Sequence, residues 1–328
     1  MIVDGHTDLL YELAFRAGEE HPFATHWLPK LRAGGVGVQV CPIYVDVADL
    51  PELGLRRALQ QATAFRRAVD ECPDEVCEIL SAADLEQLDG RIGLLLSIEG
   101  AEPFGYDPGL ADVFFELGAR MMSLTWNRRN PFADGVGETS DGGLSRLGRT
   151  LVDRLAALGA IIDLAHASPK TFFDVLECAP EAAICVSHAN CRAVVETPRN
   201  LSDDQLRALA ARGGVVGVLA HPFVLKPGEP TIDRLVDHID HAATVMGDGH
   251  VGLGGDFMRQ IVASGAIKVV PDALLPAGMA LDAAVEGLAG PEDYPALITA
   301  LRNRGYDSER LDGVLGGNWL RLLRHALP

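Results

Sequence analysis

The sequence predicts a (β/α)8 barrel, the TIM-barrel fold, from the pattern of its apolar segments. Eight short apolar runs alternate with longer amphipathic stretches along the 328 residues. Each run is apolar almost without interruption, which is typical of strands buried on both faces of a parallel sheet. Eight strand–helix units in a chain of this length favour a barrel, and a doubly wound sheet is the alternative.

The expected elements follow directly from these runs. The eight strands are expected at residues 2–3, 36–45, 92–98, 120–125, 160–164, 182–187, 214–219 and 251–255. Helices are expected between them, at residues 55–77, 147–158, 169–177, 202–212 and 231–246. Ser202 and Gln205 form the pattern of a capping box, and Thr231 is suited to cap the next helix.

The chain is expected to form a single domain over residues 1–328, because no linker divides it. A segment at about residues 262–292, rich in Ala, Gly and Pro, is expected to be an insertion after the eighth strand that serves as a lid or packing element. The tail at residues 297–327 has a helical pattern that is interrupted at Gly305 and at Gly316-Gly317.

Composition excludes several classes of partner. The net charge of −18 disfavours nucleic acid and anionic membrane surfaces, which require clusters of Lys and Arg. The chain contains neither an apolar run of membrane-spanning length nor the pattern of a targeting segment. The six cysteines form no CxxC pair, so we expect free thiols in a reducing compartment. A cytoplasmic protein is therefore expected.

Residues that can bind a metal follow five of the eight expected strands. They are His6 and Asp8 after the first run, Glu99 after the third, His166 after the fifth, His188 after the sixth and Asp256 after the eighth. A single histidine at a strand end is more often structural. In a barrel, however, the carboxyl ends of the strands converge on one mouth, where the chemistry lies. The coincidence of six such side chains therefore predicts a metal centre.

The number of ligands suggests two ions, because it exceeds the needs of one tetrahedral zinc. Glu99 is the carboxylate expected to bridge them. A modified lysine is not expected as the bridge, because none of the lysines ends a predicted strand; they are Lys30, Lys170, Lys226 and Lys268. Two ions about 3.5–4 Å apart hold a water between them and lower its pKa. Asp256 is then expected to act as general base and acid.

The sequence resembles the renal (membrane) dipeptidase family of binuclear zinc peptidases over almost its whole length. The shared motifs are Asp4-Gly5-His6-Thr7-Asp8, residues 33–39, Ile98-Glu99-Gly100-Ala101, Leu124-Thr125-Trp126-Asn127 with Asn130, Ala133 and Gly135, Ile162-Asp163-Leu164-Ala165-His166, Ser187-His188 with Arg199-Asn200, Gly254-Gly255-Asp256-Phe257 and residues 316–321. No single motif is specific, but together they are.

The resemblance implies a role for each of these residues in a barrel of the metal-dependent hydrolase type. The implied assignments are His6 and Asp8 as ligands of one zinc, His166 and His188 as ligands of the other, Glu99 as the bridge, Asp256 as the catalytic carboxylate, Arg199 as the partner of the substrate's C-terminal carboxylate, and Trp126 and Asn127 as substrate contacts. The family cleaves dipeptides, tolerates a D-residue at the C-terminal position and suggests a homodimer.

Two positions depart from the family's pattern. Trp126 occupies the position of a histidine in the mammalian enzymes, and an indole can donate one hydrogen bond but cannot exchange a proton. Met258-Arg259 replace an Asp-Gly, and Arg259 is expected to favour an additional anionic group on the substrate. These departures concern the choice of substrate more than the class of reaction.

The expected function is that of a zinc-dependent dipeptidase in which a metal-bridging hydroxide attacks the peptide carbonyl. The alternatives are a related metallohydrolase that cleaves another small amide or modified peptide, and an inactive metal-binding scaffold. Mixed nitrogen and oxygen ligands also accept manganese or cobalt. His238 and His241 are not expected to bind metal. Ser187 and His188 are not expected to form a nucleophile–base pair, because adjacent side chains of a strand point to opposite faces.

Overall fold

A closed ring of parallel strands forms the centre of the computed structural model, which describes residues 1–225, 228–267 and 282–328. The strands are β1 (Ile2–Asp4), β2 (Val36–Tyr44), β3 (Val76–Glu78), β4 (Ile92–Glu99), β5 (Met121–Ser123), β6 (Ile161–Asp163), β7 (Ile184–Ala189), β8 (Val215–Leu219) and β9 (Val251–Gly254). Their order is β2-β1-β9-β8-β7-β6-β5-β4-β3, and β2 also pairs with β4. That pairing closes eight strands into a barrel and leaves β3 outside the ring.

The predicted (β/α)8 barrel is confirmed, and each of the eight predicted runs overlaps one strand of the ring. The ninth strand, β3, was missed because the helix expected at residues 55–77 is shorter. It forms α4 (Gly54–Glu71), and the helix ends just before Pro73. A proline disfavours the helical conformation of the residue before it. The chain is therefore free to add Val76–Glu78 to the start of β4.

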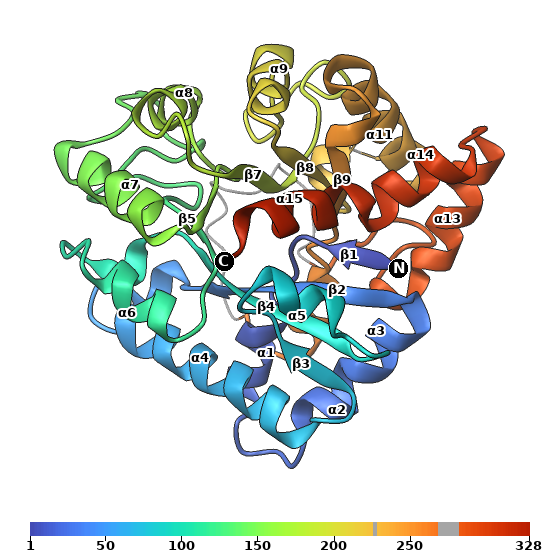
Figure 1. Cartoon of the computed structure of the whole chain (residues 1–328), viewed down its shortest axis with the longest axis horizontal. Helices are drawn as coiled ribbons and strands as arrows, with labels where there is room; N and C mark the ends of the chain where they lie inside the picture. The colour runs from blue at the N-terminus through green and yellow to red at the C-terminus, as the bar shows by residue number, and fades with distance from the viewer. Residues whose placement is uncertain (226–227, 268–281) are drawn as a thin grey trace.

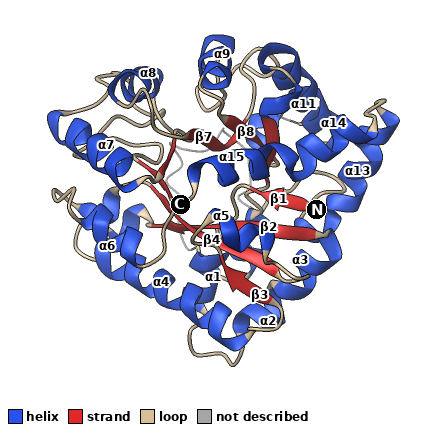
Figure 2. Cartoon of the chain, viewed as in Figure 1, coloured by secondary structure: helices blue, strands red, loops and turns tan. Residues whose placement is uncertain are grey.

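Helices surround the ring of strands (Figures 1 and 2). They are α1 (Leu9–Phe15), α2 (Pro22–His26), α3 (Leu28–Gly34), α4, α5 (Ala82–Glu86), α6 (Leu110–Glu116), α7 (Arg146–Leu158), α8 (Pro169–Cys178), α9 (Asp203–Ala211), α10 (Pro222–Leu225), α11 (Ile232–Met246), α12 (Met258–Ala263), α13 (Tyr294–Asn303), α14 (Ser308–Asp312) and α15 (Asn318–Ala326), with short 3-10 turns η1 (Val47–Asp49), η2 (Glu102–Phe104), η3 (Asp248–His250) and η5 (Pro291–Asp293) and a π-helical turn η6 (Gly313–Gly317). In the described part of the chain, no helix is both long enough and apolar enough to cross a membrane.

The predicted helix starts are confirmed at two capping residues. Ser202 and Gln205 form a reciprocal capping box at the start of α9. The side chain of Thr231 accepts a hydrogen bond from the Arg234 N–H at the start of α11. Each cap satisfies backbone N–H groups that have no partner within the first turn of a helix.

The C-terminal helix α15 closes one end of the barrel and crosses the centre of the ring in Figure 1. Trp319 is fully buried, and its Nε1–H donates to the carbonyl of Leu253 at 3.0 Å. Leu322 and Leu323 pack in a cluster with barrel residues such as Val3. These barrel residues lie near the amino ends of the strands, so the carboxyl ends, where we expect the site, face the opposite side.

The segment expected as an insertion, residues 262–292, is only partly described, because residues 268–281 lie outside the described part. Before that gap, α12 covers Met258–Ala263. After it, Glu286 forms a parallel bridge with Thr231 at the start of α11. The insertion and the single domain remain predictions, and the tail is built from α13, α14, η6 and α15.

His238 on α11 links two loops of the barrel as a neutral side chain. Its ring is 0% exposed, and Nδ1 accepts the Cys191 N–H at 3.1 Å. Nε2–H then donates to the carbonyl of Leu225 at 3.1 Å. Burial lowers the pKa of His238 to about 4. This histidine is therefore structural, as its exclusion from the expected metal ligands implies.

His238 should make the protein less stable in mild acid. In the unfolded chain a histidine takes up a proton near pH 6.5, whereas the folded protein resists protonation until about pH 4. The unfolded state therefore binds more protons between these values, and the free energy of unfolding falls as the pH falls, by up to about 3 kcal/mol. Urea titrations of wild-type and His238→Gln protein between pH 6.5 and pH 4 should give a flatter slope for the variant. His241→Gln, at a partly exposed position of the same helix, is the control, and an equal change of slope in both variants would contradict the assignment.

Candidate metal centre

The five predicted metal ligands and the predicted catalytic residue Asp256 converge at the carboxyl ends of the barrel strands. His6 and Asp8 follow β1, Glu99 ends β4, His166 lies beyond β6, His188 belongs to β7, and Asp256 follows β9. Ligand atoms of His6, Glu99 and His188 lie within 4.8 Å of one another, and so do those of His6, Asp8 and Asp256. His6, which belongs to both groups, is 2% exposed. The barrel thus brings together residues up to 250 positions apart in the sequence.

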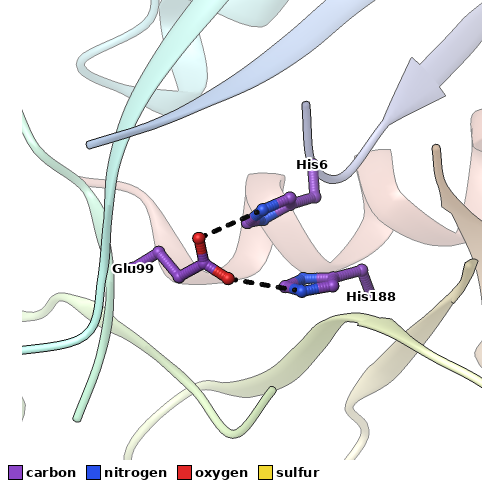
Figure 3. A group of neighbouring side chains, drawn as sticks. All are labelled: His6, Glu99 and His188. Carbon is purple, nitrogen blue, oxygen red and sulfur yellow. Dashed lines mark ion pairs between the residues drawn. The ribbon is translucent and has the colours of Figure 1, made fainter. Parts of the chain in front are cut away.

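Glu99 lies between the histidines and turns one carboxylate oxygen towards each side (Figure 3). Its Oε1 is 2.9 Å from His166 Nε2 and 3.4 Å from His188 Nε2. Its Oε2 is 3.7 Å from His6 Nε2. A carboxylate in this arrangement is suited to bridge two cations, one on the His6 side and one on the His166–His188 side.

All three histidines direct Nε2 to the cluster and hold Nδ1 against a polar group behind it. His166 Nδ1 lies 2.6 Å from Asn127 Oδ1, which can only accept, so Nδ1 carries the proton. Ser187 Oγ lies 2.8 Å from His188 Nδ1 and 3.4 Å from His6 Nδ1. Such partners fix the tautomer of a metal-binding imidazole and leave the lone pair on Nε2.

The charge state of the cluster suits a cation. Burial, assisted by Arg199, lowers the pKa of His166 to about 3, so this imidazole is neutral and able to bind a metal. Burial opposes a charge on His6, but Glu99, Asp8 and Asp256 around it together raise its pKa to about 10. The three carboxylates therefore strongly favour a positive charge at this position.

The residues present fit a divalent metal. Nε2 of His6 and Oδ1 of Asp8 are buried without a hydrogen-bond partner among the described residues, and both face the cluster. His166 Nε2 and His188 Nε2 are 2.8 Å apart, where two lone pairs repel unless a cation lies between or beside them. Imidazole nitrogens with carboxylate oxygens are typical ligands of zinc and also accept manganese or cobalt.

Two further carboxylates, both fully buried, hold the loops that carry these ligands. Asp4 Oδ1 accepts the Gly255 N–H at 2.8 Å and the His6 N–H at 3.2 Å, which ties the loop after β1 to the loop after β9. Asp163 Oδ1 accepts the Ser187 N–H at 2.8 Å. Each aspartate therefore joins two ligand-bearing strands, although neither belongs to the two groups of potential ligands.

The backbone is strained at two of the predicted residues. His166 has a φ of 63° and Asp256 a φ of 48°. Both lie in the left-handed region that residues other than glycine rarely adopt. The Asp256 N–H donates to the carbonyl of His6 at 2.8 Å, which helps to hold this conformation. Such strain persists where the surroundings impose it, and it is concentrated at functional sites.

Asp256 and Arg199 border the cluster. Burial raises the pKa of the Asp256 carboxyl to about 6. Arg199 is 7% exposed, and its Nη2 donates to the carbonyl of His188 at 2.7 Å and approaches His166 Nε2 at 3.1 Å. Its Nε has no hydrogen-bond partner in the described part of the chain. Burial lowers the pKa of Arg199 to about 10, so the guanidinium remains charged at neutral pH.

The remaining predicted residues lie in different places. The Trp126 ring is 5.8 Å from the His166 ring, at the edge of the cluster. Asn127 contacts His166 through Oδ1, and its expected contact with substrate stays a prediction. Arg259 is exposed and lines a surface pocket of about 280 Å³ with Trp27 and other residues, none of them a predicted ligand. The structure therefore gives no support to the expectation that Arg259 receives an anionic group.

Ser187 and His188 do not point to opposite faces as expected, because Ser187 Oγ lies 2.8 Å from His188 Nδ1; that they form no nucleophile–base pair stays a prediction. The register between β7 and β8 shifts between Val186 and Ala189. This irregularity lets two adjacent side chains face the same site, which a regular strand does not allow. The alternation of side chains along the strand could not reveal this irregularity.

Of the lysines excluded as a bridge, Lys30 and Lys170 form ion pairs with Glu292 and Asp174, and the other two lie outside the described residues.

Comparison with known proteins identifies a family. Residues 1–271 match the family model described as membrane dipeptidase, peptidase family M19. "Dipeptidase 3" of Mus musculus is 30% identical over 99% of this chain and 64% of its own length. The chain spans just under two thirds of this mouse relative and of its rat counterpart. "Dipeptidase aclJ" of Aspergillus oryzae is 30% identical over 98% of this chain and 77% of its own length.

Solved structures with the same fold are also similar. A crystal structure described as the dipeptidase AC, a metallopeptidase of family M19, has a TM-score of 0.86 at 26% identity and covers 99% of this chain and 98% of its own. A metallopeptidase from Rhodobacter sphaeroides has a TM-score of 0.86 at 25% identity and covers 99% of each chain. That structure holds a phosphinate mimic of the dipeptide L-Ala-D-Ala.

Replacing Asn127 should weaken metal binding. Asn127→Leu removes the acceptor that fixes the His166 tautomer, and loss of such a partner typically weakens metal binding about 10–100-fold. Asn127→Asp keeps the acceptor and should bind zinc at least as tightly as the wild type. Competition of each protein with a chromophoric chelator gives the affinities. Equal affinity in the Leu and Asp variants would exclude this role of Asn127.

Proposed function

The chain belongs to the membrane dipeptidase family, peptidase family M19, and on this premise we propose that it is a metal-dependent dipeptidase. The observation that carries the proposal is the position of Glu99, whose one oxygen faces His166 and His188 while the other faces His6. Hydrolysis of a small amide is the chemistry that two neighbouring divalent ions support.

The proposed metal ligands are those that the sequence predicts. His6 and Asp8 would hold one ion, His166 and His188 would hold the second, and Glu99 would be shared between them. Bound zinc ions supply an activated water and polarise the scissile carbonyl. Asn127 and Ser187 keep the imidazole tautomers that present Nε2 to the ions.

Asp256 is the proposed proton carrier. Its carboxyl is buried at the edge of the group formed with His6 and Asp8, and burial raises its pKa to about 6. A carboxyl with a raised pKa can accept a proton from the attacking water and return it to the leaving amine. The left-handed backbone at Asp256 holds the side chain in this place.

Arg199 is the proposed anchor of the substrate's C-terminal carboxylate. Its guanidinium is buried beside His166 and His188, and Nε has no partner in the described part of the chain. A planar guanidinium binds a carboxylate through two parallel hydrogen bonds. Because the Arg199 anchor requires a free carboxylate near the cleaved bond, it favours dipeptides over longer peptides. Dipeptides with a D-residue at the C-terminal position are included, since a related structure holds a mimic of L-Ala-D-Ala.

A panel of dipeptides tests the proposal. Protein reconstituted with zinc should cleave some members of a panel that varies both side chains and carries an L- or D-residue at the C-terminal position. Matched dipeptide amides, which lack the carboxylate, should be cleaved at least about 100-fold more slowly, because they leave the buried Arg199 charge unpaired. A panel with no cleavage at all would contradict the dipeptidase assignment.

Replacing Asp256 should separate metal binding from turnover. Asp256→Asn keeps the shape of the side chain, and asparagine is among the residues that tolerate the left-handed backbone found at this position. We expect normal zinc content and a loss of at least about 100-fold in kcat/KM, the size of a general acid–base contribution. Glu99→Ala and His6→Ala should instead lose zinc and activity together. Metal analysis and kinetics on the same samples distinguish the two classes, and a fully active Asp256→Asn enzyme excludes the proposed role.

A further inference from the structure

A second arginine lies near the candidate metal centre without a hydrogen-bond partner. Arg128 is in the loop that follows β5, and its side chain is only 19% exposed. None of its three guanidinium nitrogens is accessible to solvent, and none has a partner among the described residues. A buried guanidinium that makes no hydrogen bonds is costly, so this group requires a ligand.

The neighbours of Arg128 connect it to the metal centre. Its Cζ lies 4.9 Å from the centre of the Trp126 ring. That ring lies 5.8 Å from the His166 ring and 5.5 Å from the Tyr44 ring, and Tyr44 is directly paired with Glu99 across β2 and β4. One indole ring therefore separates the Arg128 charge from a predicted metal ligand. A substrate bound at the metal centre is then close enough to reach Arg128 with one of its side chains.

The protein itself compensates this charge only in part. The carboxylate of Glu102 is 3.9 Å from Arg128 Nε, too far for a hydrogen bond. Burial raises the pKa of Glu102 to about 7, so at neutral pH its carboxyl is only partly ionised. Arg129, the next residue, differs from Arg128 in both exposure and pairing. It is half exposed, and two of its nitrogens are paired with Asp134.

We propose that Arg128 binds a second carboxylate of the substrate, so that the enzyme prefers dipeptides with an acidic side chain. The inference rests on the proposed dipeptidase function. Arg199 holds the main-chain carboxylate and Arg128 holds the carboxylate of an Asp or Glu side chain. The Trp126 ring contacts the guanidinium through a cation–π interaction, and the substrate carboxylate would supply the hydrogen-bond acceptors that the buried N–H groups lack among the described residues. Trp126 thus contributes to substrate choice by orienting Arg128.

Pairs of dipeptides that differ only in this charge test the inference. The zinc-loaded full chain is assayed on two pairs, L-Ala-L-Glu against L-Ala-L-Gln and L-Glu-L-Ala against L-Gln-L-Ala. The same two pairs are assayed again with a D-residue at the C-terminal position. L-Ala-L-Ala is the substrate without a charged side chain. We expect kcat/KM to favour Glu over Gln by at least about tenfold at one of the two positions, the discrimination expected of one bidentate pair. Cleavage of L-Ala-L-Ala without any preference for Glu overturns the inference and leaves the dipeptidase proposal intact. Failure to cleave any member overturns both.

Variants then assign the preference to Arg128. Arg128→Met keeps the length of the side chain, and the Glu-to-Gln ratio should fall to about one. Arg128→Lys keeps the charge without the planar fork and should give an intermediate ratio, which decides the matter if the Met variant does not fold. Arg259→Gln removes an exposed arginine elsewhere on the surface and should keep the wild-type ratio. A ratio that survives in both Arg128 variants, or that falls equally in Arg259→Gln, overturns the assignment.

Discussion

The organisation of this molecule depends on the buried carboxylate of Glu99 between opposed imidazoles. Such a group is costly in a protein interior unless cations and hydrogen bonds compensate it. The surrounding strands supply both: His6 from β1 faces one oxygen, and His166 and His188 from beyond β6 and from β7 face the other. Buried Asp4 and Asp163 then hold the loops in register through backbone N–H groups. The barrel is the scaffold that brings the ends of β1, β4, β6 and β7 to one point.

The architecture could be predicted because fully buried parallel strands leave a simple pattern. Every residue of β4 is buried, and its apolar run is unmistakable in the sequence. Helix starts with clear capping chemistry, such as Ser202 and Thr231, were also predictable. The short strand β3 was not, because its residues have no distinctive pattern and form a strand only by adding to the edge of β4. Local preference is a weak guide where the pairing partner decides the conformation.

The candidate site was predictable as a set of residues but not as a geometry. Six side chains that can bind a metal stood at strand ends, and the barrel made their convergence a consequence of topology. The contact of Ser187 with His188 depends on an irregular register in β7, and the left-handed backbones of His166 and Asp256 are imposed by tertiary contacts. The environment of Arg128 depends on Trp126 and Glu102, which approach it only in the folded chain. The charge state and the burial of a residue depend on the folded structure and cannot be read from the sequence alone.

The seating of α15 on the barrel has a consequence for how the molecule is made. Residues from the start of the chain, Val3 and Gly5, contact Trp319 near its end, and β1 pairs with β9. As the chain is synthesised from its amino end, β1 and His6 emerge before these partners and remain without them until β9 and α15 have followed. Contacts between residues so distant in sequence form late and slowly. The nascent polypeptide therefore carries an incomplete ring with open edges until β9 pairs with β1 and α15 packs against the barrel.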